Sequence, residues 1–258
     1  MPLLVCLDPG HGGYDPGACA NDIQEKDVNL YAAQHLRDLL EHAGINVIMT
    51  RDSDVCPAGD TSNVTKDLQA RCDISDNAGV DYFISIHFNA GGGVGSESYC
   101  IPGGQANEVA PSLVDATAAI FGYHGEKVKD GGPNGANLYV LKHTNAHAIL
   151  LEIAYLDSSD AQKIKDHIAE VAPKLAIPLI KMLGGNVNVD APVPVAPTTV
   201  ISSSNSVVDM SEYVTKKELT DAITAIQKQI EVKMDADIAT GITAGIAQKM
   251  AKIQSDLV

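Results

Sequence analysis

Short apolar runs that end in a polar residue alternate with longer amphipathic stretches, and this alternation limits the fold more than any other feature of the chain. Runs of about four to eight apolar residues are typical of buried strands, and the longer stretches have the length of helices. Strands that alternate with helices predict an α/β layer architecture. We expect strands over residues 3–8, 45–49, 82–88, 97–101, 137–141 and 148–155, and helices over 26–43, 65–79, 107–123 and 159–183.

Two histidines and one acidic residue stand where this pattern would form a binding site. His11 follows the first run in DPGHGG, Glu25 comes fourteen positions later in QEKD, and His87 ends a later run in SIHFNA. Ligands of open α/β sheets bind outside the carboxyl ends of strands, so both histidines should line one crevice, with Glu25 facing it from the start of a helix. Two imidazoles and one carboxylate leave the fourth position of a zinc ion open to water or substrate. The trio predicts a catalytic Zn²⁺ site, against the alternative of a chance grouping in a chain with eight histidines.

Glycines surround the first histidine of this trio. Gly10, Gly12 and Gly13 flank His11 in the sequence. Glycine lets the backbone turn sharply and approach another group closely. We therefore expect both features in the loop that carries His11.

One charged residue, Glu152, interrupts the apolar run AILLEIAYL at residues 148–156. Burying a lone carboxylate costs free energy and raises its pKa unless a partner compensates. A nearby dication is one such partner, and accepting the proton of an attacking water is one use for the residue. The alternative is an ion pair between Glu152 and a lysine or arginine in the core.

Five blocks of the sequence occur in the order of a known family. They are DPGHGG, QEKDVNL, the MTR of residues 49–51, DLQARCDISDNAGVDYFISIHFNA and VLKHTNAHAILLEIAYLDSSDAQKI. Together they resemble the zinc-dependent N-acetylmuramoyl-L-alanine amidase family of the amidase_3 type, over about residues 3–183. The resemblance implies a mixed, largely parallel twisted sheet with helices on both faces. It also implies that His11, Glu25 and His87 are the zinc ligands and that Glu152 is the catalytic glutamate.

By this resemblance the protein cleaves the amide between N-acetylmuramic acid and the L-alanine that begins the stem peptide of peptidoglycan. Zinc would activate the attacking water, and Glu152 would accept its proton and pass it to the leaving nitrogen. The sequence departs from the family at His147, where proline is frequent, and at Ala154, where glycine is common. A zinc peptidase acting on the stem peptide is the alternative enzyme. A non-catalytic oligomeric wall-binding protein with an idle amidase fold is the alternative of another class.

Further polar residues near the strand ends are candidates for substrate binding. Asn89 follows the second histidine closely and is placed to meet a substrate carbonyl. His143 and His147 precede the last predicted strand and could line the groove. Arg71 either pairs internally with carboxylates or meets the acidic stem peptide. The remaining histidines are expected to be solvated surface groups, namely His35, His42, His124 and His167.

Length and composition indicate a globular domain with an extension. With 258 residues, of which 45% are apolar, the chain can form one domain of ordinary size with a proper core. No apolar run reaches the roughly 18 residues of a membrane span, and no secretory signal precedes the first predicted strand. Because peptidoglycan lies outside the membrane, we expect a phage or prophage endolysin. Such a protein accumulates in the host cytoplasm and acts on the bacterial cell wall once the membrane is permeabilised.

The net charge of −15 argues against targeting by long-range attraction. An acidic surface is repelled by nucleic acid and by anionic wall polymers. We therefore expect no nucleic acid and no membrane among the partners, and a short-range recognition of peptidoglycan.

The composition of the sequence changes twice after the last predicted helix. These changes predict a zinc amidase catalytic domain over residues 1–184, a Pro/Ser-rich linker over 185–210 and a helical module over 211–258. From Leu219 to Leu257 apolar residues recur at spacings of three or four, which is typical of a helix with one narrow apolar stripe. Such a stripe should fold into a hairpin, bind the wall or assemble with copies of itself. We expect a homo-oligomer through this helix, which would raise avidity for the wall.

Overall fold

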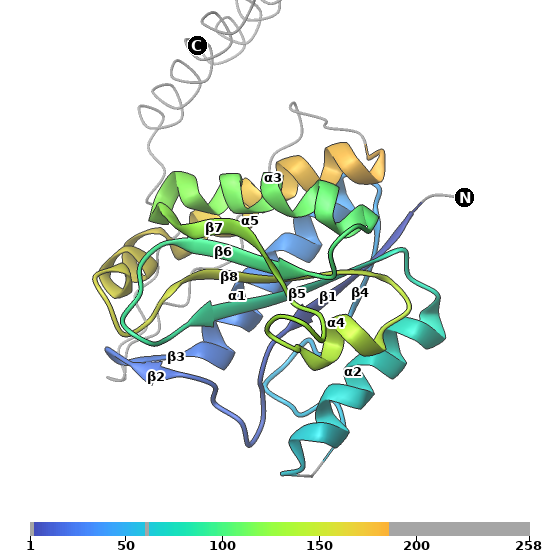
Figure 1. The fold of residues 1–258 in the computed structure, drawn as a ribbon, viewed down its shortest axis with the longest axis horizontal. Helices are drawn as coiled ribbons and strands as arrows, with labels where there is room; N and C mark the ends of the chain where they lie inside the picture. Colours follow the sequence, from blue (N-terminus) through green and yellow to red (C-terminus); the bar gives the residue numbers. More distant parts are fainter. Residues whose placement is uncertain (1–2, 60–61, 186–258) are drawn as a thin grey trace, which may run out of the picture. The chain divides into compact units, whose positions relative to one another are not determined.

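A six-stranded sheet forms the centre of the structure, a computed structural model that describes residues 3–59 and 62–185 (Figure 1). The strand order is β4-β1-β5-β8-β6-β7. All neighbours in this order are parallel except β6 and β8, which are antiparallel. The sheet is therefore mixed and largely parallel, as the sequence predicts. The strands are β1 (Leu4–Pro9), β4 (Asn46–Met49), β5 (Tyr82–Asn89), β6 (Ser96–Cys100), β7 (Tyr123–Asp130) and β8 (His147–Tyr155), and a separate small hairpin consists of β2 (Cys19–Ala20) and β3 (Ile23–Gln24).

Helices cover both faces of this sheet (Figure 1). Three of them pack together on one face, namely α1 (Glu25–His42), α3 (Gln105–Phe121) and α5 (Asp160–Leu183). The other face is covered by α2 (Val64–Ala78) and the short α4 (Tyr139–His143), which contact each other. The three-layer arrangement agrees with the predicted fold class.

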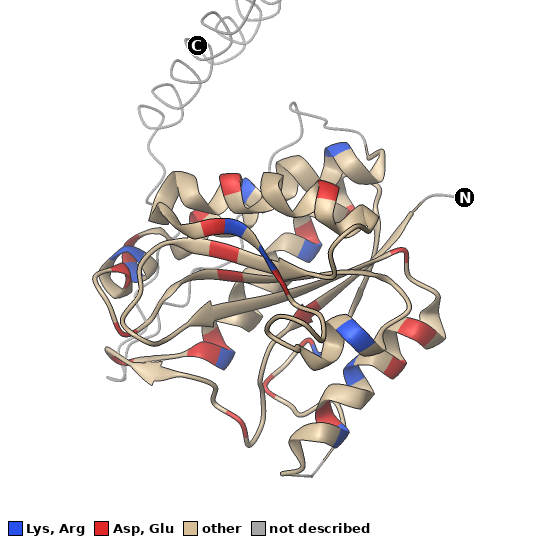
Figure 2. Ribbon diagram, viewed as in Figure 1, with Lys and Arg blue, Asp and Glu red and all other residues tan. Residues whose placement is uncertain are grey.

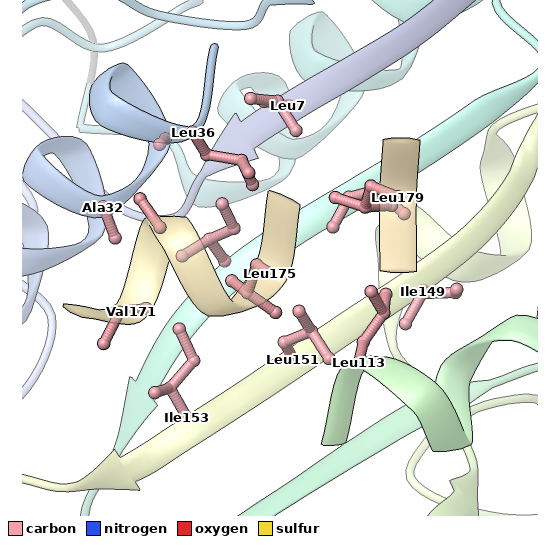
Figure 3. Close-up of a cluster of buried hydrophobic side chains, with 14 of the residues drawn as sticks. Leu7, Ala32, Leu36, Leu113, Ile149, Leu151, Ile153, Val171, Leu175 and Leu179 are labelled. Atoms are coloured by element: carbon pink, nitrogen blue, oxygen red, sulfur yellow. The ribbon is translucent and has the colours of Figure 1, made fainter. Parts of the chain in front are cut away.

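The larger core lies between the sheet and the three-helix face. Figure 3 shows Leu175 and Leu179 of α5 among side chains of the strands and of α1, such as Leu36 and Leu151. Each of these leucines is fully or almost fully buried. Removing one such side chain from water contributes about 1.5–3 kcal/mol to stability. This packing holds α1 against the sheet, and with it Glu25 at the start of the helix.

Side chains alternate between the two faces of each strand, so the face covered by α2 and α4 has its own set of residues. In β5, Ile84 and Ile86 belong to the larger core, whereas Phe83 belongs to a smaller cluster under α2 and α4. Because side chains alternate between the faces of a strand, Ser85 and His87 follow Phe83 on the α2 and α4 side. Towards the carboxyl ends of the strands this face therefore becomes polar.

Two expectations for the strands are wrong. Residues 137–141, predicted as a strand, contain the start of α4, because an apolar run as short as LYVL does not distinguish a short helix from a strand. The strand β7 has the sequence YHGEKVKD and was not predicted at all. It is an edge strand whose residues are half-buried or exposed, so no apolar run marks it. The other predicted elements agree with the structure to within two residues at each end.

The predictions for the carboxyl-terminal part stay predictions. The linker over residues 185–210, apart from Gly185, and the helical module over 211–258 with its self-association lie outside the described residues. Within the described ranges, no helix combines the length and the apolar character that a membrane crossing requires.

Candidate metal centre

The three predicted metal ligands come from separate elements and meet at the carboxyl end of the sheet. His11 lies just after β1, Glu25 is the first residue of α1, and His87 lies near the end of β5. One possible ligand atom of each residue lies within 4.8 Å of the other two. Nε2 of His11 is 3.0 Å from Oε2 of Glu25, and Nδ1 of His87 is 2.9 Å from Oε1 of the same carboxylate. The fold thus brings together residues that are far apart in the sequence.

Glycines provide the space that this trio needs. A Cβ atom at Gly10 would lie 2.1 Å from the ring of His87, and one at Gly17 would lie 2.5 Å from Oε2 of Glu25. A side chain at either position would therefore displace a ligand. His11 itself has a φ of 61°, a left-handed conformation that costs about 1–3 kcal/mol for a residue other than glycine. The sharp turn and the close approach that the glycines predict are both present.

Groups around the ligands fix their orientation. Nδ1 of His11 lies 2.8 Å from Oδ2 of Asp15. A carboxylate on the second ring nitrogen is the usual support of a metal-ligating imidazole. Glu25 accepts hydrogen bonds from the backbone N–H groups of Ala18, at 2.9 Å, and Phe88, at 3.3 Å. Sequence reasoning missed Asp15, although a carboxylate four residues after a predicted histidine ligand is a visible signal.

The pKa shifts of His11 and Glu25 indicate that the site favours positive charge. Burial lowers the pKa of His11, but hydrogen bonds and charge attraction from Glu25 and Asp15 outweigh it and raise the pKa to about 9. Burial raises the pKa of Glu25, but the two histidines outweigh it and hold the pKa well below its usual range. A site that stabilises a proton in this way is suited to a cation.

The donor set fits a zinc ion. Two imidazole nitrogens and a carboxylate oxygen are ligands that Zn²⁺ binds in catalytic sites. Glu25 is almost entirely buried, whereas the side chains of His11 and His87 are 24% and 18% exposed. A metal held by these atoms would therefore be anchored in the protein and still accessible from one side. This combination is typical of a metal site that acts on a substrate.

Glu152 lies beside this trio. It is the register partner of His87 on the neighbouring parallel strand β8. Its Oε2 atom is buried and has no hydrogen-bond partner among the described residues. Burial raises the pKa of Glu152 to about 7, and the negative charges of Glu25 and Glu97 add to the effect while His87 opposes it. An unpartnered carboxylate with a pKa near neutrality is suited to accept and return a proton.

The alternative that Glu152 pairs with a basic residue in the core is not what the structure shows. Its neighbour Glu97 of β6 forms such a pair instead, with its carboxylate in contact with the ammonium group of Lys129 on β7. Both β6 and β8 carry acidic residues within the sheet (Figure 2). Sequence reasoning missed Glu97 as a member of the site because its partner lies on the strand that was not predicted.

Two of the predicted substrate-binding residues have internal partners. Arg71 is 2% exposed and forms ion pairs with Asp8, at 2.8 Å, and Asp67, at 2.9 Å. It also donates a hydrogen bond to the backbone carbonyl of His11, at 2.7 Å. Of its two predicted roles, internal pairing is the one that the contacts support. Asn89 donates to Oε1 of Glu97, at 3.3 Å, and its own Oδ1 accepts the N–H of the next residue.

The remaining histidines lie at different places relative to the centre. His147 begins β8, so the strand separates it from Glu152 by about 17 Å. The ring of His143 stacks on Tyr139, with centroids 4.1 Å apart. His124, expected as a surface group, lies in β7 with its ring against Tyr155. The structure therefore places His147 away from the trio, and it places His124 beside Tyr155 and Glu97.

The sequence is similar to those of a known family and of several known proteins. The sequence matches the family described as N-acetylmuramoyl-L-alanine amidase over residues 5–176. It is 37% identical over 173 residues to the N-acetylmuramoyl-L-alanine amidase CwlM of Bacillus licheniformis, which covers 63% of this chain and 61% of that protein. It is 34% identical over 169 residues to the endolysin of Bacillus phage SPP1, with 62% of this chain and 57% of that protein covered. The chain spans about three fifths of the length of these relatives.

The fold is also similar to solved structures. The CwlD amidase of Clostridioides difficile, determined in complex with the GerS lipoprotein, has a TM-score of 0.62 at 27% sequence identity. This similarity covers 70% of the present chain and 98% of that chain. Cwp6 of Clostridium difficile has a TM-score of 0.61 at 30% identity, over 70% of this chain and 29% of that one. By its sequence match, its fold and its site, the chain belongs to the N-acetylmuramoyl-L-alanine amidase family.

Proposed function

We propose that the protein is a zinc-dependent N-acetylmuramoyl-L-alanine amidase. It hydrolyses the amide between N-acetylmuramic acid and the first L-alanine of the peptidoglycan stem. The observation that carries the proposal is the half-buried carboxylate of Glu152 beside His87 of the ligand trio, whose buried Oε2 atom has no hydrogen-bond partner among the described residues. The family match over residues 5–176 supplies the substrate class.

His11, Glu25 and His87 would hold the zinc ion. When bound, zinc polarises a carbonyl group and lowers the pKa of water towards about 7. The protein orients the ligands through Asp15 on His11 and through backbone N–H groups on Glu25. Because these supports come from the loop between β1 and β2 and from β5, the three donor atoms keep their arrangement without help from the substrate.

Glu152 moves the proton. Its carboxylate accepts a proton from the attacking water, and the carboxylic acid then donates that proton to the nitrogen of the departing L-alanine. Both steps need a group whose pKa lies close to the working pH, and burial gives Glu152 this property. The C–N bond of the amide breaks, and the products are a free carboxylate on the muramic acid and a free amine on L-alanine.

Analysis of the reaction products separates this function from its alternatives. The full chain is incubated with purified peptidoglycan, and mass spectrometry identifies the residue that carries each new amino terminus. An amidase exposes only the amino group of the first L-alanine and leaves intact stem peptides. A zinc peptidase exposes amino groups inside the stem, and a wall-binding protein with an idle fold exposes none.

We further propose that the enzyme serves in host cell lysis. The similarity to the SPP1 endolysin supports this role, although a sporulation-specific amidase of Bacillus subtilis is similar to the same degree, with 36% identity. Production of the protein inside bacteria tests it. A lysis enzyme clears the culture only after a pore-forming agent has permeabilised the membrane. The Glu152→Gln variant, produced at the same level, does not clear the culture even after this treatment.

A further inference from the structure

A buried carboxylate, that of Glu97, lies next to the proposed general base. Glu97 is 2% exposed and is the register partner of Glu152 across the antiparallel pair of β6 and β8. Residues that face each other in this way have their side chains on the same side of the sheet, with Cβ atoms about 5 Å apart. Two carboxylates at this separation repel each other in a buried site. The structure must therefore compensate the charge of one of them.

Lys129 compensates the charge of Glu97. Its ammonium group contacts Oε2 of Glu97, and its side chain is 32% exposed, so the lysine reaches in from the rim of the sheet. His124 approaches the same oxygen, with Nε2 at 4.0 Å. The other oxygen, Oε1, accepts hydrogen bonds from the hydroxyl groups of Tyr99, at 3.1 Å, and Tyr155, at 3.5 Å. Because both oxygens are engaged, Glu97 is not itself suited to exchange protons with a substrate.

Two partners of Glu97, Asn89 and Tyr155, lie on β5 and β8, the strands that carry His87 and Glu152. Asn89 of β5 donates to Oε1 of Glu97, and Asn89 is in turn the register partner of Tyr155 in β8. The pairing of β5 and β8 is irregular between His87 and Asn89, so the backbone ladder is interrupted beside the metal centre. At such an interruption one strand bends, and side-chain contacts decide its direction. Glu97 connects the ends of both strands just past this point.

We propose that Glu97, with Lys129 as its counter-ion, is a positioning residue of the hydrolytic site. It ties the ends of β5 and β8 together through Asn89 and Tyr155, and so keeps the carboxylate of Glu152 in place relative to His87. The inference rests on the proposed amidase function, because it concerns the proton transfer by Glu152. It assigns a role in the reaction to residues that contact neither the metal ligands nor the proton in transit.

The test compares substitutions in the full chain. Glu97→Gln removes the charge at constant shape, Lys129→Met removes the counter-ion, and Lys129→Arg keeps it. Lys127→Met is the matched control, since Lys127 lies two residues earlier on the same strand and pairs with the exposed Asp115. For each protein, kcat and KM on a soluble muramoyl peptide, zinc content and the fraction folded are measured.

A positioning role predicts a specific pattern. Glu97→Gln and Lys129→Met should lose about tenfold to a hundredfold in kcat, because a displacement of the order of 1 Å has this effect on a reacting group. KM should stay within about threefold, zinc content should be unchanged, and Lys129→Arg and Lys127→Met should behave like the wild type. A normal kcat in Glu97→Gln overturns the proposal. A parallel loss of zinc, folded fraction and activity in Lys129→Met also overturns the proposal, because that pattern would mean that Lys129 only stabilises the fold.

The outcome also separates this inference from the proposed function. If the wild type yields no amidase product, the proposed function itself is wrong. If the wild type is active and both charge-removing variants are equally active, only the role of Glu97 is wrong. Should Glu97→Gln fail to fold, the comparison of Lys129→Met with Lys129→Arg decides, because Lys129 is partly exposed and the two variants differ in whether they keep the positive charge beside Glu97.

Discussion

His87 and Glu152 are register partners on the neighbouring parallel strands β5 and β8. A proposed metal ligand and the proposed general base therefore lie next to each other on neighbouring strands. On the other side of β5, β1 ends at Pro9, and the loop with His11 begins directly after it. Sites built on strands are more precise than sites built on loops. The separation of His87 and Glu152 is thus set by the sheet itself.

Replacement of Glu152 by glutamine should separate metal binding from turnover. Glu152→Gln keeps the shape of the side chain and leaves His11, Glu25 and His87 untouched, so zinc content should equal that of the wild type. Without the proton acceptor, kcat should fall by about 100-fold to 10,000-fold. Metal analysis and an assay on purified peptidoglycan measure both quantities, and near-normal activity in this variant would remove Glu152 from the mechanism.

Replacement of Asp15 should weaken the metal site although Asp15 is not a ligand. The carboxylate of Asp15 holds Nδ1 of His11, so Asp15→Asn should lower zinc affinity by about 10-fold to 100-fold. A competition titration with a chromophoric chelator measures this affinity. Asp22→Asn is a suitable control, because Asp22 is exposed and lies on the neighbouring β-hairpin turn. Equal affinities of wild type and Asp15→Asn contradict the supporting role.

Zinc binding should depend on pH through His11. In the metal-free protein the pKa of His11 is about 9, so this imidazole is protonated at neutral pH and must lose its proton to bind the metal. Below about pH 9, the affinity should fall about tenfold for each pH unit, and near pH 7 about one proton should be released from His11. Calorimetry in two buffers of different ionisation enthalpy counts the released protons. An affinity that is constant from neutral to alkaline pH is incompatible with this coupling.

Arg71 should matter for stability more than for substrate binding. Its guanidinium group is buried between Asp8 and Asp67, and Arg71→Met would leave both carboxylates without their partner. Breaking a buried pair in this way should lower the free energy of unfolding by about 3–5 kcal/mol. Arg37→Met removes the half-exposed pair of Arg37 with Asp38 and should cost at most about 1 kcal/mol. Urea denaturation compares the two, and similar small losses would show that the Arg71 network is not a structural support.

The sheet and the trio could be predicted because their signals are local. The strands around His11, His87 and Glu152 are buried on both faces, so their sequences are continuous apolar runs, and each functional residue lies within its run or just after it. Parallel strands then place these residues at one edge of the sheet. This placement is why the candidate metal centre could be predicted from the sequence.

The rest of the site depends on contacts that no local pattern reveals. The counter-ion of Glu97 is Lys129, which lies on the polar edge strand β7. An edge strand is exposed on one side and carries charged residues, so its sequence resembles a loop. His147 was expected near the groove because it precedes Glu152 in the sequence, but a strand is extended and carries it to the opposite end of the sheet.

The most direct test of the account is a zinc titration of the chelator-treated full chain, followed by the release of new amino termini from purified peptidoglycan. The account predicts that activity is absent without metal, rises in proportion to added zinc and saturates at about one ion per chain. All new amino termini should belong to L-alanine, and His11→Ala should stay inactive at every zinc concentration. Full activity in the presence of the chelator, or new amino termini on any other residue, would contradict the account.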